Sequence, residues 1–152
     1  MTGSETDLDL DAALTRLEAT ATSLRLRLRD HMGVSGVDLT VVQFVSRAES
    51  AGRPVRVKDL SSHLGITGPA VTTAVDRLER SGHLQRRPNP EDGRSRLIEL
   101  TDTSRARYAA AMDSTNEHLH ELMASFSDRD RAKFVRIIER VITALDGGAP
   151  RP

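Results

Sequence analysis

Hydrophobic residues recur with helical spacing near both ends of the chain. Between residues 8 and 32 they fall at offsets of 0, 4, 7, 11, 14 and 18, which places them on one face of a helix. This stripe consists of Leu10, Leu14, Leu17, Ala21, Leu24 and Leu28. The same offsets return in Tyr108, Met112, Thr115, Leu119, Leu122 and Phe126. The pattern predicts helices over residues 8–32 and 101–146, with a capping box of Ser127 and Asp130 starting the last one.

These flanking helices carry more aliphatic surface than the central part of the chain needs for its core. The last helix adds a further stripe, made of Phe134, Ile137, Ile138, Val141 and Leu145. An exposed apolar patch of that size is a liability for a single chain. The sequence therefore predicts a homodimer, and a self-contained helical bundle is the alternative.

Shorter elements, separated by glycine and proline, fill the middle of the chain. A helix is predicted from about Asp38 or Thr40 to Ala51, with apolar residues on one face. Residues 57–65 form another short helix, in which Gly65 is placed as the C-terminal stop.

The next helix begins at Thr67 or Gly68 and runs to about Arg80, with Pro69 tolerated in its first turn. Its buried face comprises Val71, Ala74, Val75 and Leu78. Its opposite face carries Pro69, Thr73, Asp76 and Arg80, with Thr72 and Arg77 at the edges of that face. Two short helices joined by a glycine-containing turn fit a helix-turn-helix over residues 57–81. An ordinary helical hairpin with a solvated face is the alternative.

A β-hairpin is predicted directly after this pair of helices. Residues 83–87 and 96–100 are strand-like, and the segment 88–95 between them is rich in turn formers. A hairpin in this place is a wing, spanning residues 83–100. Its tip presents Arg94, and arginine suits the negative potential of a narrow minor groove. Asp92 could accept a hydrogen bond from Arg94 or Arg87; a plain exposed turn would explain Gly93 but not the arginines.

Charge is distributed unevenly although the net charge is zero. Residues 1–50, 53–96 and 97–152 have balances of −3, +4 and −1, and eight of the nine cations of the middle segment are arginine. Arginine is the better side chain for forked recognition of phosphates and base edges. The basic centre points to a polyanionic partner, with chance fluctuation as the alternative.

Composition excludes several other classes of protein. Four aromatic residues are too few for base stacking on single-stranded nucleic acid, and the absence of cysteine excludes disulfides and thiol chemistry. No apolar run approaches the roughly 20 residues of a membrane span, and the acidic N-terminus excludes a secretory signal. We therefore expect a cytoplasmic protein. The chain has no phosphate-binding glycine loop, no Gly-x-Ser-x-Gly and no paired carboxylates in a sheltered site, so we expect no enzyme.

The central motifs resemble those of the multiple-antibiotic-resistance regulator (MarR) family of winged-helix transcription factors. The most specific stretch runs from residues 75–82 into residues 86–95. In it, Asp92-x-Arg94 is followed by the Leu-Thr of residues 100–101 at the exit of the wing. In addition, Leu39-Thr40-x-x-Gln43-Phe44 matches the opening of the family's second helix. The resemblance covers about residues 8–146. It implies a mainly α fold with a small β wing, in which a winged helix-turn-helix (37–100) lies between dimerisation helices (8–32 and 101–146) within one unit of 152 residues.

The resemblance also implies partners and site residues. The dimer would bind double-stranded DNA at a pseudo-palindromic operator, most often as a repressor. By position, the DNA-contacting residues would be Thr67, Pro69, Thr72, Thr73, Arg77, Arg87, Arg94 and Ser95, and Asp92 would support the wing. A small aromatic or anionic effector could occupy a cleft lined by Leu24, Leu28, Phe44, Tyr108 and Met112. We expect no cofactor.

Two alternatives stay open at this point. His118, His120 and Glu121 could suggest a metal site, but the two histidines lie on different sides of a helix, and two solvated surface histidines are the simpler interpretation. A winged helix could also bind protein as a dimeric adaptor, in which case the arginines would be dispensable. The sequence does not identify the operator, the genes controlled, the sign of regulation or the effector.

Overall fold

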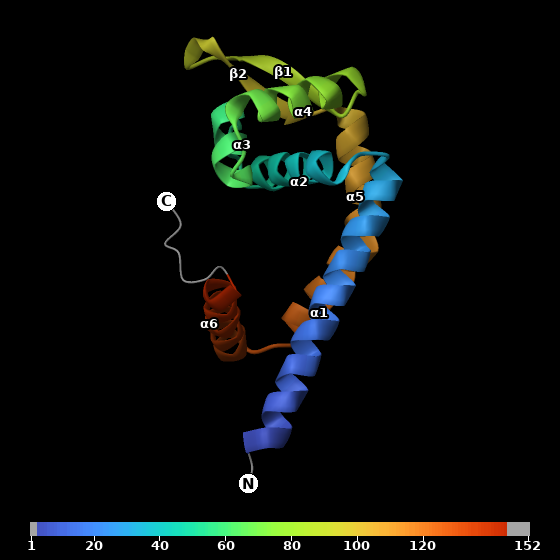
Figure 1. Cartoon of the computed structure of the whole chain (residues 1–152), viewed down its shortest axis with the longest axis vertical. Coiled ribbons are helices and arrows are strands. Elements are labelled where there is room, and N and C mark those ends of the chain that lie inside the picture. Colours follow the sequence, from blue (N-terminus) through green and yellow to red (C-terminus); the bar gives the residue numbers. More distant parts are fainter. Residues whose placement is uncertain (1–2, 146–152) are drawn as a thin grey trace. The chain divides into compact units, whose positions relative to one another are not determined.

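Six helices and one β-hairpin make up residues 3–145, the part of the chain that this computed structural model describes (Figure 1). In chain order the elements are α1 (Gly3–Met32), α2 (Gly36–Ser50), α3 (Val57–Leu64), α4 (Gly68–Arg80), β1 (Leu84–Asn89), β2 (Asp92–Leu100), α5 (Asp102–Ala124) and α6 (Asp128–Leu145). The chain divides into two compact units, residues 1–111 and 112–152, with the boundary inside α5. The mainly α fold with a small β wing is thus confirmed.

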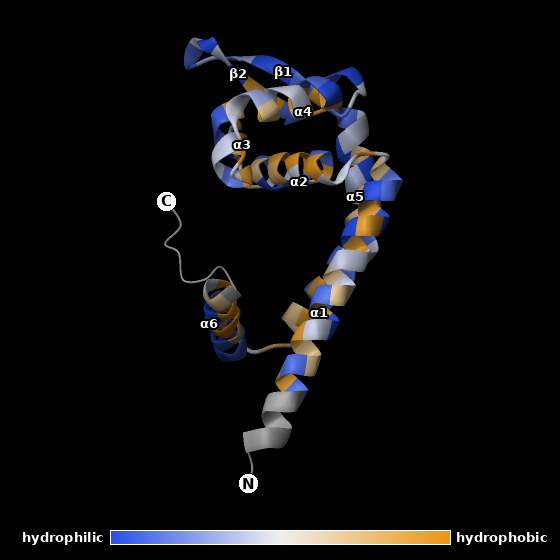
Figure 2. Ribbon diagram, in the orientation of Figure 1, coloured by the Kyte–Doolittle hydropathy of each residue, from blue (hydrophilic) through white to orange (hydrophobic). Residues whose placement is uncertain are grey.

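The core of the first unit is built around α2. This helix contacts α1, α3, α4 and β2, and Figure 2 shows it as a largely apolar helix. Val41, Val42 and Val45 are completely buried, as are Leu60, Val71 and Val75 of the two helices that follow. Because α2 is covered on several sides, its apolar residues extend beyond the single face predicted for an amphipathic helix.

The helix ends follow local chemistry. Ser35 caps α2, since its Oγ accepts a hydrogen bond from the backbone N–H of Asp38 at 3.2 Å. The helix therefore starts at Gly36, two residues before Asp38 and four before Thr40, the two predicted starts. Gly65 ends α3 in the left-handed conformation, with φ of 63°, as predicted. Thr67 precedes α4, and Pro69 lies in its first turn, also as predicted.

The strands of the wing extend further toward its tip than predicted. Strands β1 and β2 pair antiparallel with Leu84 opposite Leu100, and a bulge lies between Pro88 and Asn89. The prediction of a loop over residues 88–95 was wrong, because only residues 90 and 91 connect the strands. The bulge accommodates Pro88, which has no N–H for the ladder.

The Asn89 side chain closes the wing. Asn89 is 8% exposed; its Oδ1 accepts a hydrogen bond from Glu91 N at 3.0 Å, and its Nδ2 donates to Ser95 Oγ at 2.8 Å. These bonds span the turn. They explain why a sequence rich in turn formers continues as a ladder.

The second unit contains the C-terminal part of α5 and the whole of α6. Ser127 Oγ accepts a hydrogen bond from Asp130 N at 3.2 Å, so Ser127 caps α6 as predicted. The Ser127 hydroxyl donates to the Asp130 carboxylate at 2.6 Å, which differs from the backbone contact of a capping box. The Phe126 and Phe134 rings pack with centroids 6.3 Å apart. Figure 2 shows the apolar and polar sides of α6. The predicted boundary at residue 146 lies outside the described residues.

A membrane span is absent from the described part of the chain. Within residues 3–145, none of the helices combines the length and the apolar character needed to cross a bilayer.

Candidate nucleic-acid interface

The N-terminal half of α4 presents a small, exposed, hydroxyl-bearing surface. Thr67, Pro69, Thr72 and Thr73 are all exposed. The hydroxyls of Thr72 and Thr73 donate to the carbonyl oxygens of Gly68 and Pro69, each at 3.0 Å. With the donors used inside the helix, the methyl groups and oxygen lone pairs are left for an outside partner. This combination suits apolar contact with a thymine methyl group and acceptance from a base amino group.

Arg77 is fixed to α2 by an ion pair that sequence reasoning missed. Its Nε and Nη2 donate to Asp38 Oδ2 and Oδ1 at 2.7 and 2.5 Å, in a two-pronged arrangement. The Asp38 side chain is 5% exposed, whereas that of Arg77 is 48% exposed. One side of the guanidinium therefore braces α4 against α2 and the other faces outward. The partners are 39 positions apart, and nothing in the local pattern pairs them.

The electrostatics of Asp38 reflect this pairing. Burial by itself raises the pKa of the carboxyl, but hydrogen bonds from Arg77 and Ser35 and the charge of Arg77 outweigh it. The pKa of Asp38 is consequently below its ordinary value. The carboxylate stays charged at neutral pH and keeps Arg77 in place.

At the wing tip, Arg94 is exposed and its side chain makes no hydrogen bond or ion pair within the described residues. Its backbone N–H donates to Asp92 Oδ1 at 3.0 Å, so Asp92 shapes the turn that carries the cation. Ser95 Oγ donates to the Asp92 carbonyl at 3.2 Å. Arg87 pairs with Glu99 across the strands at 2.8 Å rather than with Asp92.

Arg86 connects the wing to α4. Its Nη2 donates to Asp76 Oδ1 at 2.5 Å, and its Nη1 contacts Glu79 Oε2. These partners raise the pKa of Arg86, led by the Asp76 hydrogen bond. The strand that leads to the wing tip is thus tied to the helix that carries the threonines. Sequence reasoning noted Arg86 only as a strand residue.

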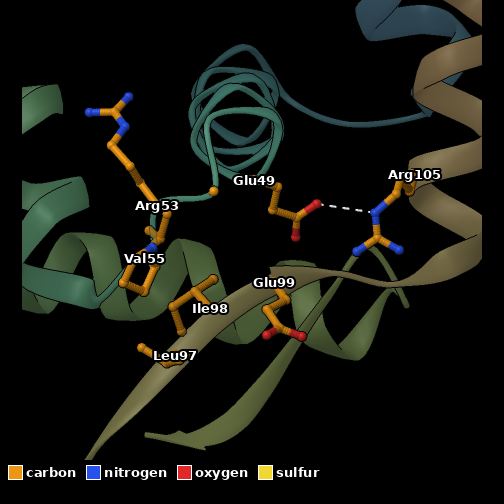
Figure 3. A pocket seen from close by; sticks show the side chains of 9 residues that line it. Glu49, Arg53, Val55, Leu97, Ile98, Glu99 and Arg105 are labelled. Carbon is orange, nitrogen blue, oxygen red and sulfur yellow. Dashed lines mark hydrogen bonds and ion pairs between the residues drawn. The ribbon is translucent and has the colours of Figure 1, made fainter. Parts of the chain in front are cut away.

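Glu49 and Arg105 tie the base of the wing to α2 and α5. Glu49 accepts from Leu100 N at 2.8 Å and from Arg105 Nε at 3.1 Å. Glu49 and Arg105 line a cavity of about 410 Å³ (Figure 3), and Val55 and Ile98 form part of its walls. Arg53 points away from the Glu49–Arg105 pair in that view. The cavity did not figure among the sequence predictions.

The five residues predicted for a ligand cleft lie in different surroundings. Leu28 is 3% exposed in the core, Phe44 packs against the His63 ring at 4.4 Å, and Tyr108 hydrogen-bonds Gln43. Leu24 is half-buried on α1, and Met112 is the first residue of the second unit. A cavity of about 310 Å³ beside α1 and α2 is lined instead by Thr22, Arg25, Leu26, Arg29, Gly36 and Leu39.

Metal ligands do not assemble in the described residues. No group of three or more His, Asp or Glu side chains there is arranged to hold an ion, His118, His120 and Glu121 included.

A protein-family comparison finds a match for the central part of the chain. The model described as "MarR family" matches residues 32–95, which contain α2, α3, α4 and most of the wing. This central segment therefore resembles the MarR family.

Curated proteins that are similar to the chain are transcriptional regulators. The regulator YwoH of Bacillus subtilis is 35% identical over 81 residues, covering 53% of this chain and 58% of that protein. YdgJ of B. subtilis is 28% identical over 109 residues, covering 72% and 64%. The chain thus spans less than two thirds of either protein. The transcriptional repressor MprA of Escherichia coli is 25% identical over 135 residues, covering 88% and 77%. These relatives are named as transcriptional regulators rather than enzymes.

Solved structures share the fold of the chain. YusO of B. subtilis superposes with a TM-score of 0.61 at 17% identity, covering 95% of this chain and 99% of that one. A MepR mutant from a multidrug-resistant S. aureus clinical isolate gives 0.65 at 16% identity, covering 88% and 96%. Another S. aureus MepR mutant, bound to an oligodeoxyribonucleotide, gives 0.57 at 17% identity, covering 88% and 96%.

Proposed function

We propose that this chain is a MarR-family, sequence-specific regulator of transcription that binds double-stranded DNA as a homodimer. One observation carries the proposal: the small exposed face of α4 stands beside a wing whose tip presents Arg94, an arginine without a side-chain partner among the described residues. A helix-turn-helix places its second helix in the major groove. Arginine at a wing tip is suited to the narrow minor groove alongside.

The proposed contacts follow from where the side chains lie. Thr67, Pro69, Thr72 and Thr73 approach base edges, while the half-exposed Arg77 stands at the far end of the same helix. Arg94 enters the minor groove. Arg87 and Ser95, which already have partners in the wing, contact phosphates with their remaining hydrogen-bonding capacity.

Exposed apolar side chains on three helices support the homodimer. They include Leu10, Leu17, Leu119, Leu122, Phe134 and Ile137, at 44–57% exposure. Covering them with a second copy removes this surface from water. A twofold dimer reads a pseudo-palindrome whose half-sites lie about one helical turn, roughly 10 bp, apart.

Regulation completes the proposal. Relatives named as repressors, MprA and YetL among them, favour repression. A small aromatic or anionic effector would release the DNA, and the protein would act in the cytoplasm, where its operator is accessible.

Selection from a random pool of duplexes tests the proposal. The full chain is incubated with the pool, bound duplexes are amplified, and the enriched sequences are read. We expect a pseudo-palindrome with half-sites about 10 bp apart. A pool that stays random after repeated rounds would overturn the proposal and leave a protein-binding adaptor as the interpretation.

A further inference from the structure

A second basic surface lies between α3 and the wing, apart from the residues assigned above to the base edges and the minor groove. A groove of about 400 Å³ there is lined by four cationic side chains, from Arg56, Lys58, Arg86 and Arg96, and by a single carboxylate, that of Asp92. Val57 and Ser95 complete its walls. The positive charges outnumber the negative charge in the lining itself.

The four cations differ in whether they are already neutralised. Arg56 pairs with Asp59 at 3.2 Å, and Arg86 pairs with Asp76 and Glu79. Lys58 and Arg96 are exposed, and their side chains make no hydrogen bond or ion pair within the described residues. Two uncompensated cations on the walls of one groove favour an anion between them.

The place of the groove indicates which anion it receives. One wall is the start of α3, the first helix of the helix-turn-helix, and in this motif the first helix crosses the DNA backbone. The other wall is β2, close behind the Arg94 that enters the minor groove. A strand of phosphates separates adjacent major and minor grooves, so it must pass between the parts of the protein that occupy them.

We propose that this groove binds a backbone phosphate of the operator, held by Lys58 from α3 and Arg96 from β2. The inference rests on the proposed DNA-binding function and adds two residues to it. The contact carries no base specificity, and it fixes the register of the wing relative to α3. A lysine and an arginine converging on one phosphate also make this contact dependent on ionic strength.

Binding measurements on single-charge variants test the contact. We expect Lys58→Gln and Arg96→Gln each to weaken binding to the selected operator about fivefold to tenfold and to flatten the salt dependence by up to about one unit of the logarithmic slope. The loss should be the same on random DNA, so that the preference for the operator is retained. Arg53→Gln removes one exposed charge from a neighbouring cavity and should change neither quantity.

Neutral phosphate substitution locates the contact. Methylphosphonates are introduced one at a time along the operator, and binding is compared between the wild type and Lys58→Gln. At one position in each half-site, the methylphosphonate should weaken DNA binding by the wild type several-fold. It should have little effect on binding by Lys58→Gln, because this variant has already lost the same interaction. If the wild type binds its operator and Arg94→Ala weakens it, but Lys58→Gln and Arg96→Gln match Arg53→Gln, the groove is not a phosphate site. If the wild type shows no operator preference at all, the proposed function itself has failed.

Discussion

Arg77 and Asp38 show how one ion pair serves both the fold and the proposed interface. The carboxylate is almost wholly buried while the guanidinium is half exposed, so the two partners differ in what their loss leaves behind. Removing Arg77 strands a buried negative charge, whereas removing Asp38 leaves a cation that water can reach.

Substitution of the two partners should therefore have unequal effects on stability. We expect Arg77→Met to lower the urea midpoint of unfolding more than Asp38→Asn does. In the wild type, the lowered pKa of Asp38 means that its contribution is present above its ordinary value of 3.8 and is lost as the pH falls through the folded value. Arg77→Met should remove this acid-range dependence. Equal decreases in the urea midpoint for Arg77→Met and Asp38→Asn would contradict this expectation, which rests on the difference in burial of the two side chains.

His83 makes a second prediction at the residue scale. It is 7% exposed, and its Nδ1 is hydrogen-bonded to Ser104 Oγ at 3.3 Å. Burial lowers the pKa of His83, the charge of Arg107 lowers it further, and Asp38 opposes both. The folded protein thus favours the neutral ring, while the unfolded chain takes up a proton near pH 6.5.

Stability should accordingly fall as the pH decreases below about 6.5, until the folded protein also binds the proton. Urea unfolding between pH 5 and 7.5 measures this dependence, and His83→Gln should reduce it. Since the contribution of Asp38 is lost only below its ordinary value of 3.8, the two effects occupy different pH ranges. An unchanged slope in His83→Gln would show that another group titrates here.

At the scale of elements, the wing depends on Asn89. Its two side-chain hydrogen bonds span the turn in a buried position. We expect Asn89→Ala to destabilise the wing locally by about 1–3 kcal/mol, because the partners lose buried hydrogen bonds. Hydrogen exchange of the β1 and β2 amides should accelerate, while amides in α2 keep their protection. Uniform acceleration throughout the chain would instead indicate global destabilisation.

The elements also show how far the sequence could be read. Helix spacing, Gly65 and Pro69 predict α3 and α4 because these signals act within one turn of helix. The strands of the wing were predicted too short, since their extension depends on a buried Asn89 side chain bonded to Ser95. The ion pair between Asp38 and Arg77 joins residues that are 39 positions apart. Lys58 and Arg96, which line one groove, are 38 positions apart. Both arrangements exist only after folding. The motifs predicted α4 and the wing tip as the interface, whereas their bracing residues became visible only in three dimensions.

For the whole molecule, the exposed apolar surface of α5 and α6 predicts association. Leu122 is 48% exposed, and its neighbour His120 is also exposed. Leu122→Glu should shift the protein toward monomer in analytical ultracentrifugation, because a charge in an apolar interface is costly. His120→Glu introduces a negative charge two positions away, on another side of the helix, and should leave the dimer intact. A wild type that sediments as a monomer at micromolar concentration would contradict the homodimer.

DNA recognition by α4 and the wing is the central claim, and the salt dependence of binding tests it most directly. Fluorescence anisotropy with the selected operator and a scrambled duplex is measured across a salt series for the wild type and Arg94→Ala. We expect tight, operator-preferring binding with a steep negative salt slope in the wild type, and weaker binding with a slope flatter by about one unit in Arg94→Ala. Binding that ignores the sequence, or that Arg94→Ala leaves unchanged in both affinity and slope, would contradict the account.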